Sequence, residues 1–304
     1  MATLNTCSLS GLSAFIVTPT DETGTVNTDQ LSRLVTHATQ PGIASIGVLG
    51  STGSYMYLSA DQRARALAAA VEAAGAVPVI AGIGALTTHE VLQNLKAAET
   101  AGAAGALLAP VTYLPLTEPE VAHLFRTVAA NTDLPVCFYN NPGTTGFTPS
   151  ETLITDLATD GTIAAVKMPP APEGDFARQI ARLRAATPGD FVIGYSGDAF
   201  IAGALEAGAD AWYSVLAGTL PDVALRLWKA KDNPAQLAAV NKNLAPLWAL
   251  FNAHGSIRVI YEVVNILGLG PYAPLAPQQP LPQEVRGQIE LALDAVKQAD
   301  HAAA

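Results

Sequence analysis

Cysteine, charged residues and aromatic residues are all scarce in this chain of 304 residues. The two cysteines, Cys7 and Cys137, are too few and too far apart to indicate a disulfide framework or a zinc site. Charged residues make up 14% of the chain and hydrophobic residues 50%, a balance that excludes intrinsic disorder and a coiled coil. We therefore expect a folded protein, with Cys137 in its core.

Positive charge is also in deficit. Lysine and arginine number 16 against 26 aspartates and glutamates, and this net charge of −10 argues against a nucleic-acid binder. The uncharged stretch 100–117 is broken by glycines and prolines, so it does not predict a membrane span, and residues 1–10 show no secretory signal. We expect a cytoplasmic protein without a metal, because its five histidines lack metal-ligand spacing.

Short apolar or β-branched runs alternate with longer alanine-rich runs of helical period. The predicted strands are 13–17, 44–49, 77–81, 105–109, 135–139, 163–166, 191–194 and 211–215. The predicted helices are 28–39, 59–74, 88–101, 118–130, 149–158, 174–186, 198–207 and 221–231. Eight strands that are each followed by a helix predict a (β/α)8 TIM barrel of class α/β, although a count of seven or nine elements stays open.

Two kinds of local signal support this division. Four segments have the hydroxyl-x-x-Glu/Gln form of a helix capping box, and they are 59–62, 87–90, 117–120 and 148–151. In the last of these, Pro149 is predicted at the first helical position. No G-x-G-x-x-G follows the first strand, which favours a closed barrel over an open dinucleotide-binding sheet.

The pattern changes after residue 232. Three further helical segments, at 236–251, 256–267 and 282–299, follow one another, with a proline-rich stretch at 271–282 between the last two. We predict a catalytic barrel over residues 1–232 and a C-terminal helical extension over residues 233–304. This extension would pack on the barrel or on a neighbouring subunit.

Lys167 is the most informative residue for function. It follows the apolar run 163–166 and is the only charged residue between Asp160 and Glu173. An ammonium group in such surroundings is poorly solvated, which lowers its pKa and favours a neutral amine that can form a Schiff base with a carbonyl. The alternative is a structural lysine that reaches from the strand end to solvent.

Two other features fit a Schiff-base site. Tyr139 ends the preceding strand, and neighbouring barrel strands lie about 4.8 Å apart, so its phenol could reach an imine on Lys167 and relay a proton. The alternative is a tyrosine that bonds a loop carbonyl. Ser51 and Thr52 lie between two glycines after the second strand. They offer hydroxyls and backbone N–H groups to a carboxylate, or they form an ordinary turn.

Taken together, these features resemble the dihydrodipicolinate synthase/N-acetylneuraminate lyase family of class I aldolases. The resemblance rests on the run 50–53, the pattern Tyr139-Asn-x-Pro-x-x-x-Gly146, Lys167 and the turn 196–198, and it extends over essentially the whole chain. It implies a (β/α)8 barrel with a helical C-terminal appendage, assembled as a tetramer or a dimer. It also implies a Schiff base between Lys167 and the keto carbon of pyruvate or a longer 2-oxo acid, without a further cofactor.

The same resemblance implies roles for individual residues. Ser51 and Thr52 would bind the carboxylate of the 2-oxo acid, and Thr52 would also link Tyr139 into a proton relay. Tyr139 would be the general acid and base. Gly197 would line the pocket through its carbonyl, and Tyr213 would line it from the last strand.

Departures from the family pattern bear on the second substrate. Lysine-pathway synthases carry an arginine after the strand-five tyrosine that grips the carboxylate of aspartate semialdehyde, and Thr144 stands here instead. Ser54 replaces the usual glutamate. Val111 and Thr112 occupy the place of the family's paired tyrosines, and Tyr113 stands one step further on. Of the acidic pair that sialate lyases use for the sugar tail, only Asp198 remains as a substrate-binding candidate.

These observations give a ranked set of functions. First comes a 4-hydroxy-2-oxo acid aldolase that releases or consumes pyruvate and an aldehyde, with Lys167 as nucleophile and Tyr139, Thr52 and Tyr113 as its catalytic partners. The alternatives within the same chemistry are dihydrodipicolinate synthase proper and a keto-deoxy sugar acid dehydratase. A barrel that binds a 2-oxo acid without turning it over is the alternative from another class.

Overall fold

Eight parallel strands close into a barrel in the computed structural model, which describes residues 6–303. Each strand pairs with the next one along the chain, and β1 pairs with β8 to complete the ring. The strands are β1 (Gly11–Phe15), β2 (Ser45–Val48), β3 (Val79–Gly82), β4 (Gly105–Leu108), β5 (Val136–Tyr139), β6 (Ala165–Met168), β7 (Val192–Tyr195) and β8 (Ala211–Ser214). The predicted (β/α)8 barrel is confirmed.

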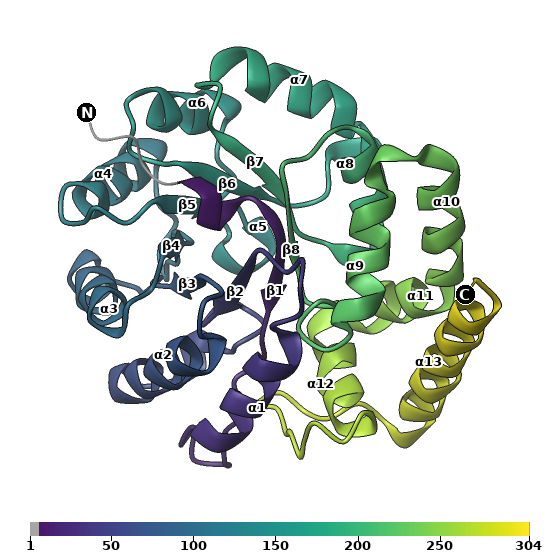
Figure 1. The fold of residues 1–304 in the computed structure, drawn as a ribbon. Coiled ribbons are helices and arrows are strands. Elements are labelled where there is room, and N and C mark those ends of the chain that lie inside the picture. The colour runs from purple at the N-terminus through teal and green to yellow at the C-terminus, as the bar shows by residue number, and fades with distance from the viewer. Residues whose placement is uncertain (1–5, 304) are drawn as a thin grey trace.

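Helices surround this barrel, as Figure 1 shows. Those that follow the strands are α1 (Thr28–Ala38), α2 (Ala60–Ala74), α3 (Thr88–Ala101), α4 (Glu118–Ala129), α6 (Glu151–Thr159), α7 (Phe176–Ala186), α8 (Ile201–Glu206) and α9 (Pro221–Lys229). A short helix, α5 (Pro142–Thr145), lies in the loop after β5. Apolar side chains of the helices pack against the outer faces of the strands and form the main hydrophobic core.

The strand bounds differ from prediction by at most two residues at either end, and one difference matters for function. The prediction ended the sixth strand at residue 166, whereas β6 runs to Met168. Lys167 therefore lies inside the strand, with Tyr139 of β5 and Gly194 of β7 as its register partners. Because side chains alternate across a strand, this register directs Lys167 and Tyr139 into the same barrel interior.

The predicted capping boxes are confirmed at two of four places. Thr87–Glu90 forms a reciprocal capping box, and in Thr117–Glu120 the glutamate accepts the backbone N–H at 2.7 Å. At α2 only half of the box forms, because Ser59 accepts from the backbone of Gln62 but the Gln62 carboxamide does not return the bond. That carboxamide accepts the backbone N–H of Val26 at 2.7 Å and so ties the chain before α1 to α2.

The fourth predicted helix start is wrong. Ser150, and not Thr148, is the N-cap of α6, and its hydroxyl accepts the backbone N–H of Leu153 at 3.1 Å. The helix begins at Glu151, so Pro149 lies before the cap and not at the first helical position. Two hydroxyl residues flank Pro149, and the one after it takes the cap.

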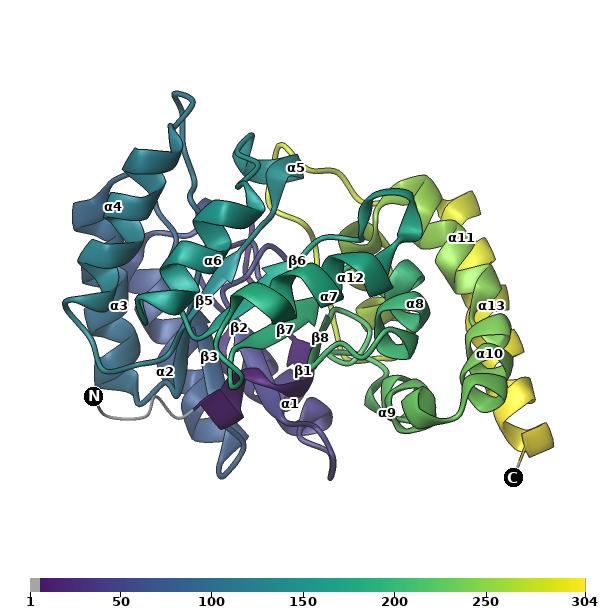
Figure 2. The same cartoon turned by 90° about the horizontal axis from the view of Figure 1, so that it is seen from above.

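The C-terminal segment contains four helices, and Figure 2 shows α10, α11 and α13 together on one side of the barrel. They are α10 (Pro234–Asn243), α11 (Ala245–His254), α12 (Ser256–Ile266) and α13 (Gln283–Ala303). The prediction of one helix over 236–251 is wrong, because Pro246 in the first turn of α11 forces a new helix to begin after Leu244. The division of the chain into two units at residue 232 stays a prediction.

Hydrogen bonds join this C-terminal segment to the barrel of the same chain. The Ser54 hydroxyl after β2 lies 2.9 Å from the Tyr261 hydroxyl of α12 and 3.5 Å from the Tyr272 hydroxyl. The Gln30 side chain of α1 donates to the carbonyls of Leu269 and Pro271 at 3.2 and 2.8 Å. The C-terminal segment was expected to pack on the barrel or on a neighbouring subunit, and these bonds show that it packs on its own barrel.

The loop after β2 depends on a glycine in the neighbouring strand. Leu49 turns the chain away from β2 with a positive φ of 59°, and its carbonyl oxygen faces Gly82 at the end of β3. A Cβ atom at Gly82 would lie 1.8 Å from that oxygen. No other residue at this position permits the same path of the loop that carries Ser51 and Thr52.

We expect Gly82→Ala to lower the free energy of unfolding by at least about 2 kcal/mol, because the added methyl group must displace the Leu49 backbone. Gly189→Ala is the matched control, since its Cβ would meet nothing within 4 Å. Urea unfolding followed by circular dichroism measures both. Equal stability of the two variants would contradict the predicted close approach.

Candidate active site

The Lys167 side chain is enclosed by aromatic rings inside the barrel. It is 4% exposed, and its Nζ lies 3.6 Å from the centroid of the Phe15 ring, 4.3 Å from that of Tyr139 and 5.6 Å from that of Tyr213. Burial lowers its pKa from 10.5 to about 7, and electrostatic interaction with Cys137 and Asp198 offsets only part of this effect. The alternative of a lysine that reaches solvent is wrong, and a large share of the amine is neutral near pH 7.

Tyr139 lies beside this amine at the end of β5. Burial raises the pKa of its phenol, although hydrogen bonding to Ser51 and Asn141 partly opposes the rise. The phenol therefore stays protonated at neutral pH and is directed toward polar side chains of the β2 and β5 loops. These side chains, and not a loop carbonyl as in the structural alternative, hold its hydroxyl.

The Ser51–Thr52 turn contributes one hydroxyl to this group and buries the other. The Ser51 hydroxyl accepts a hydrogen bond from the Asn141 side chain at 3.3 Å. Thr52 is only 3% exposed, and the neighbours of the Tyr139 phenol are Ser51 and Asn141. The expected link from Thr52 to Tyr139 is therefore absent from the described residues. Asn141 was not among the predicted site residues. The signal that could have found it is its place two residues after Tyr139, in the loop at the end of the same strand.

A cavity of about 480 Å³ opens above Ser51, between the barrel and the C-terminal segment. This volume lies within the usual range for small-molecule sites, roughly 300–1,000 Å³. The barrel side is lined by Ser51, Ser54, Tyr55, Met56, Tyr57, Val111 and Thr144, and the C-terminal side by Gly255, Ser256, Ile257, Arg258, Tyr261 and Gln278. Two predicted substrate-binding residues, Ser51 and Thr144, thus face the same space.

Three predicted residues do not line this cavity. Tyr113 is 90% exposed in the loop after β4 and does not line the cavity, so within one chain it is not part of the site. Tyr213 presents only its ring to Lys167, because its hydroxyl donates to the Leu9 carbonyl at 2.8 Å, at the opposite end of the barrel. Gly197 adopts a positive φ of 85°, and its carbonyl accepts the Phe200 N–H at 2.9 Å instead of standing free.

Asp198 has a structural environment. Its carboxylate is 2% exposed and accepts hydrogen bonds from the Ser214 hydroxyl at 2.5 Å, the Leu216 N–H at 3.1 Å and the Val215 N–H at 3.4 Å. Burial raises its pKa, and these bonds oppose the rise. Because these partners are the last residue of β8 and the two residues that follow it, the carboxylate holds the end of this strand, and its contact with substrate stays a prediction.

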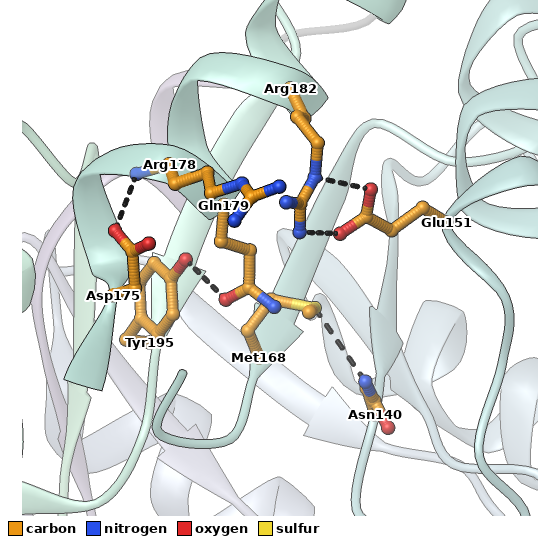
Figure 3. A network of polar contacts seen from close by, with 8 residues as sticks. All are labelled: Asn140, Glu151, Met168, Asp175, Arg178, Gln179, Arg182 and Tyr195. Atoms are coloured by element: carbon orange, nitrogen blue, oxygen red, sulfur yellow. Dashed lines mark hydrogen bonds and ion pairs between the residues drawn. The ribbon is translucent and has the colours of Figure 1, made fainter. Parts of the chain in front are cut away.

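Contacts on the outer face of the barrel hold the strands that carry Lys167 and Tyr139, as Figure 3 shows. The Asn140 amide nitrogen lies 3.6 Å from the Met168 sulfur, so the residues that follow Tyr139 and Lys167 contact each other outside the barrel. The Tyr195 hydroxyl of β7 donates to Gln179 of α7 at 2.8 Å, which ties that helix to the next strand. Contacts on the outer face of the barrel thus support the strands from which Lys167 and Tyr139 point inward.

A barrel with a desolvated lysine inside it defines a carbon–carbon lyase of the class I aldolase type. The chain belongs to the dihydrodipicolinate synthetase family, whose family model matches residues 8–296.

Relatives and solved structures agree with this assignment. The chain is 34% identical over 222 residues to the 4-hydroxy-tetrahydrodipicolinate synthase of Xanthomonas campestris pv. campestris, which covers 72% of each chain. It is 29% identical over 273 residues to the enzyme of the same name from Methanococcoides burtonii, covering 88% of this chain and 92% of that one. The crystal structure of dihydrodipicolinate synthase from Agrobacterium tumefaciens str. C58 superposes with a TM-score of 0.93 at 46% identity, covering 95% and 98% of the two chains.

Two features are absent from the described residues. They contain no group of three or more His, Cys, Asp or Glu side chains arranged to hold a metal ion. None of their helices is long and apolar enough to cross a membrane. The cytoplasmic location and the tetramer or dimer stay predictions.

The buried amine makes a prediction about stability. The folded-state pKa of Lys167, about 7, lies below the unfolded value of 10.5, so burial of this lysine costs stability fully below pH 7 and progressively less as the pH rises to 10.5. We expect Lys167→Met to raise the free energy of unfolding by more than about 1 kcal/mol at pH 6.5, and by less at pH 10. Denaturant unfolding at both pH values measures this.

Lys242→Met, on the exposed surface of α10, is the control and should show no such pH-dependent gain. If the gain from Lys167→Met were the same at both pH values, Lys167 would not be a desolvated amine.

Proposed function

We propose that this protein joins pyruvate to an aldehyde through a Schiff base on Lys167, the type of reaction performed by a 4-hydroxy-tetrahydrodipicolinate synthase. The observation that carries the proposal is the enclosed Lys167 amine with a pKa of about 7. Thr144 led the sequence analysis to rank a 4-hydroxy-2-oxo acid aldolase first. The names of the relatives favour the synthase, so the order of the two is reversed.

The first step is attack of the neutral Lys167 amine on the keto carbon of pyruvate. A carbon–nitrogen bond forms, and the keto oxygen takes one proton from the attacking nitrogen. It takes a second proton from Tyr139 and leaves as water. The product is an iminium ion, so a positive charge appears on a nitrogen that was neutral in the attacking amine. The rings of Phe15 and Tyr139, 3.6 and 4.3 Å from the nitrogen, face this charge with their electron-rich surfaces and stabilise it.

The second step makes the new carbon–carbon bond. The Tyr139 phenolate removes a proton from the methyl group of the bound pyruvate, and the electron pair moves toward the iminium nitrogen to give an enamine. The enamine carbon attacks the aldehyde carbon, and the aldehyde oxygen takes up a proton. Water then hydrolyses the iminium and releases Lys167 as the free amine.

The turn after β2 holds the carboxylate of pyruvate in this scheme. Ser51 offers its hydroxyl, and the Ser51–Thr52 backbone offers N–H groups in a segment bent by positive φ angles of 59° at Leu49 and 53° at Ser54. Thr144 lies across the cavity, on the side from which an aldehyde would approach. A role for Tyr113 requires a neighbouring subunit, in keeping with the expected tetramer or dimer.

Borohydride reduction in the presence of pyruvate tests the Schiff base. We expect a mass increase equal to one reduced pyruvate adduct, located by peptide mass analysis on Lys167, and a rate of trapping that rises with pH through about 7. Lys167→Met should take up no adduct. Wild-type protein that stays unmodified, or that is modified at another lysine, would refute the proposal.

Substitution of Tyr139 tests the proton transfers. We expect Tyr139→Phe to lower kcat for condensation of pyruvate with an aldehyde by about 100-fold, because general acid and base catalysis of this kind contributes about that much. Tyr195→Phe is the matched control, since it removes a buried phenol that is bonded to Gln179 outside the barrel. Similar losses in both variants would show that Tyr139 acts only on stability. Pyruvate binding without turnover in wild-type protein would indicate the non-catalytic barrel.

A further inference from the structure

Arg258 stands in the first turn of α12 and lines the cavity above Ser51. It is the only charged residue among the residues that line this cavity. The other lining groups are hydroxyls, backbone, one amide and apolar side chains. The electrostatic character of the cavity wall is therefore set by one guanidinium group in a chain whose net charge is −10.

This guanidinium forms no ion pair among the described residues, and its electrostatic neighbour is the Tyr261 phenol. Several arginines elsewhere do form ion pairs, among them Arg184 with Asp210 at 2.6 Å, Arg182 with Glu151 at 2.6 Å and Arg286 with Glu262 at 3.1 Å. Arg258 forms no ion pair and no side-chain hydrogen bond within residues 6–303. Arg258 is exposed to solvent and lines the cavity. Its planar fork of five N–H donors matches the geometry of a carboxylate.

The wall opposite Arg258 cannot supply the same recognition. Thr144 lines the cavity from the barrel side, but it carries no charge and its hydroxyl donates to the Asn141 carbonyl at 3.3 Å. Ser51, in the same cavity, lies beside the Tyr139 phenol and so marks its reactive end. A molecule bound at Lys167 and Ser51 that extends across the cavity would reach one further cationic side chain in its lining, Arg258.

We propose that Arg258 binds a second carboxylate of the substrate, on the part of the molecule remote from the 2-oxo acid group, and thereby selects dicarboxylic over monocarboxylic substrates. This inference rests on the proposed function, because the first carboxylate and the carbonyl must be held at Ser51 and Lys167. It assigns a specificity-determining role to α12, in the C-terminal segment, for a chain with threonine at position 144. Arg258 would then supply the cation that lysine-pathway synthases place at the position of Thr144.

Imine trapping measures this selection without knowledge of the natural aldehyde. The probes are two dicarboxylic 2-oxo acids, 2-oxoglutarate and 2-oxoadipate, and their monocarboxylic counterparts, 2-oxopentanoate and 2-oxohexanoate. For each probe, the concentration that gives half-maximal borohydride trapping on Lys167 is determined for the full chain. We expect the better dicarboxylic probe to act at a concentration about tenfold lower than its counterpart, as for a charge-assisted hydrogen bond.

The substitution Arg258→Gln should abolish this preference for the dicarboxylic probe and leave the trapping of pyruvate within twofold of wild type. Arg258→Lys should restore part of the preference, because it keeps the charge but not the fork. Arg33→Gln is the control: it makes the same change in net charge on an exposed position of α1, which does not line the cavity, and should leave the preference intact.

The outcomes separate the two proposals. Wild-type protein that traps no 2-oxo acid on Lys167 overturns the proposed function, and this inference with it. Normal trapping of pyruvate with no preference for dicarboxylic probes overturns only the role of Arg258. The same result follows if Arg258→Gln weakens monocarboxylic and dicarboxylic probes equally.

Discussion

Enclosure of one amine by aromatic rings is the constraint on which the rest of this structure depends. Lys167 lies against the rings of Phe15, Tyr139 and Tyr213, and neighbouring strands make room for two of them. A Cβ at Gly47 would lie 2.6 Å from the Phe15 ring, and one at Gly194 would lie 2.5 Å from the Tyr213 ring. The low pKa of the amine is therefore a property of several strands packed together and not of Lys167 alone.

The two parts of the chain contribute differently to the site. The barrel supplies Lys167, Tyr139 and the turn at Ser51, all of them at the carboxyl ends of its strands, where such barrels place their reactive groups. The C-terminal segment supplies the outer wall of the cavity, including Arg258, and is held in place by the contact of Ser54 with Tyr261. The wall formed by α12 and the barrel residues around Lys167 thus come from separate parts of the chain.

The fold and the buried lysine of the barrel could be predicted from the sequence because both leave local signals. Strand and helix periods extend over runs of neighbouring residues, and a single charge in the apolar segment 161–172 marks Lys167. Capping was less predictable: at 148–151 two hydroxyl residues compete for one cap, and only packing decides between Thr148 and Ser150.

Roles that depend on distant partners could not be predicted in the same way. Asp198 had the residue type of a substrate ligand, but its partners are Ser214 to Leu216, brought together by the pairing of β7 with β8. The Tyr213 phenol donates a hydrogen bond to the carbonyl of Leu9, which precedes β1. Arg258 left no sequence signal, since only the packing of α12 on the barrel brings it to the cavity that Ser51 lines.

Direct titration of the Lys167 amine tests the central claim, that the barrel interior desolvates this group. Nuclear magnetic resonance of protein labelled at the lysine side chains follows each amine with pH, and Lys167→Met identifies the signal that belongs to Lys167. A midpoint near pH 7 is the predicted result. A midpoint near the ordinary lysine value of about 10.4 would contradict it.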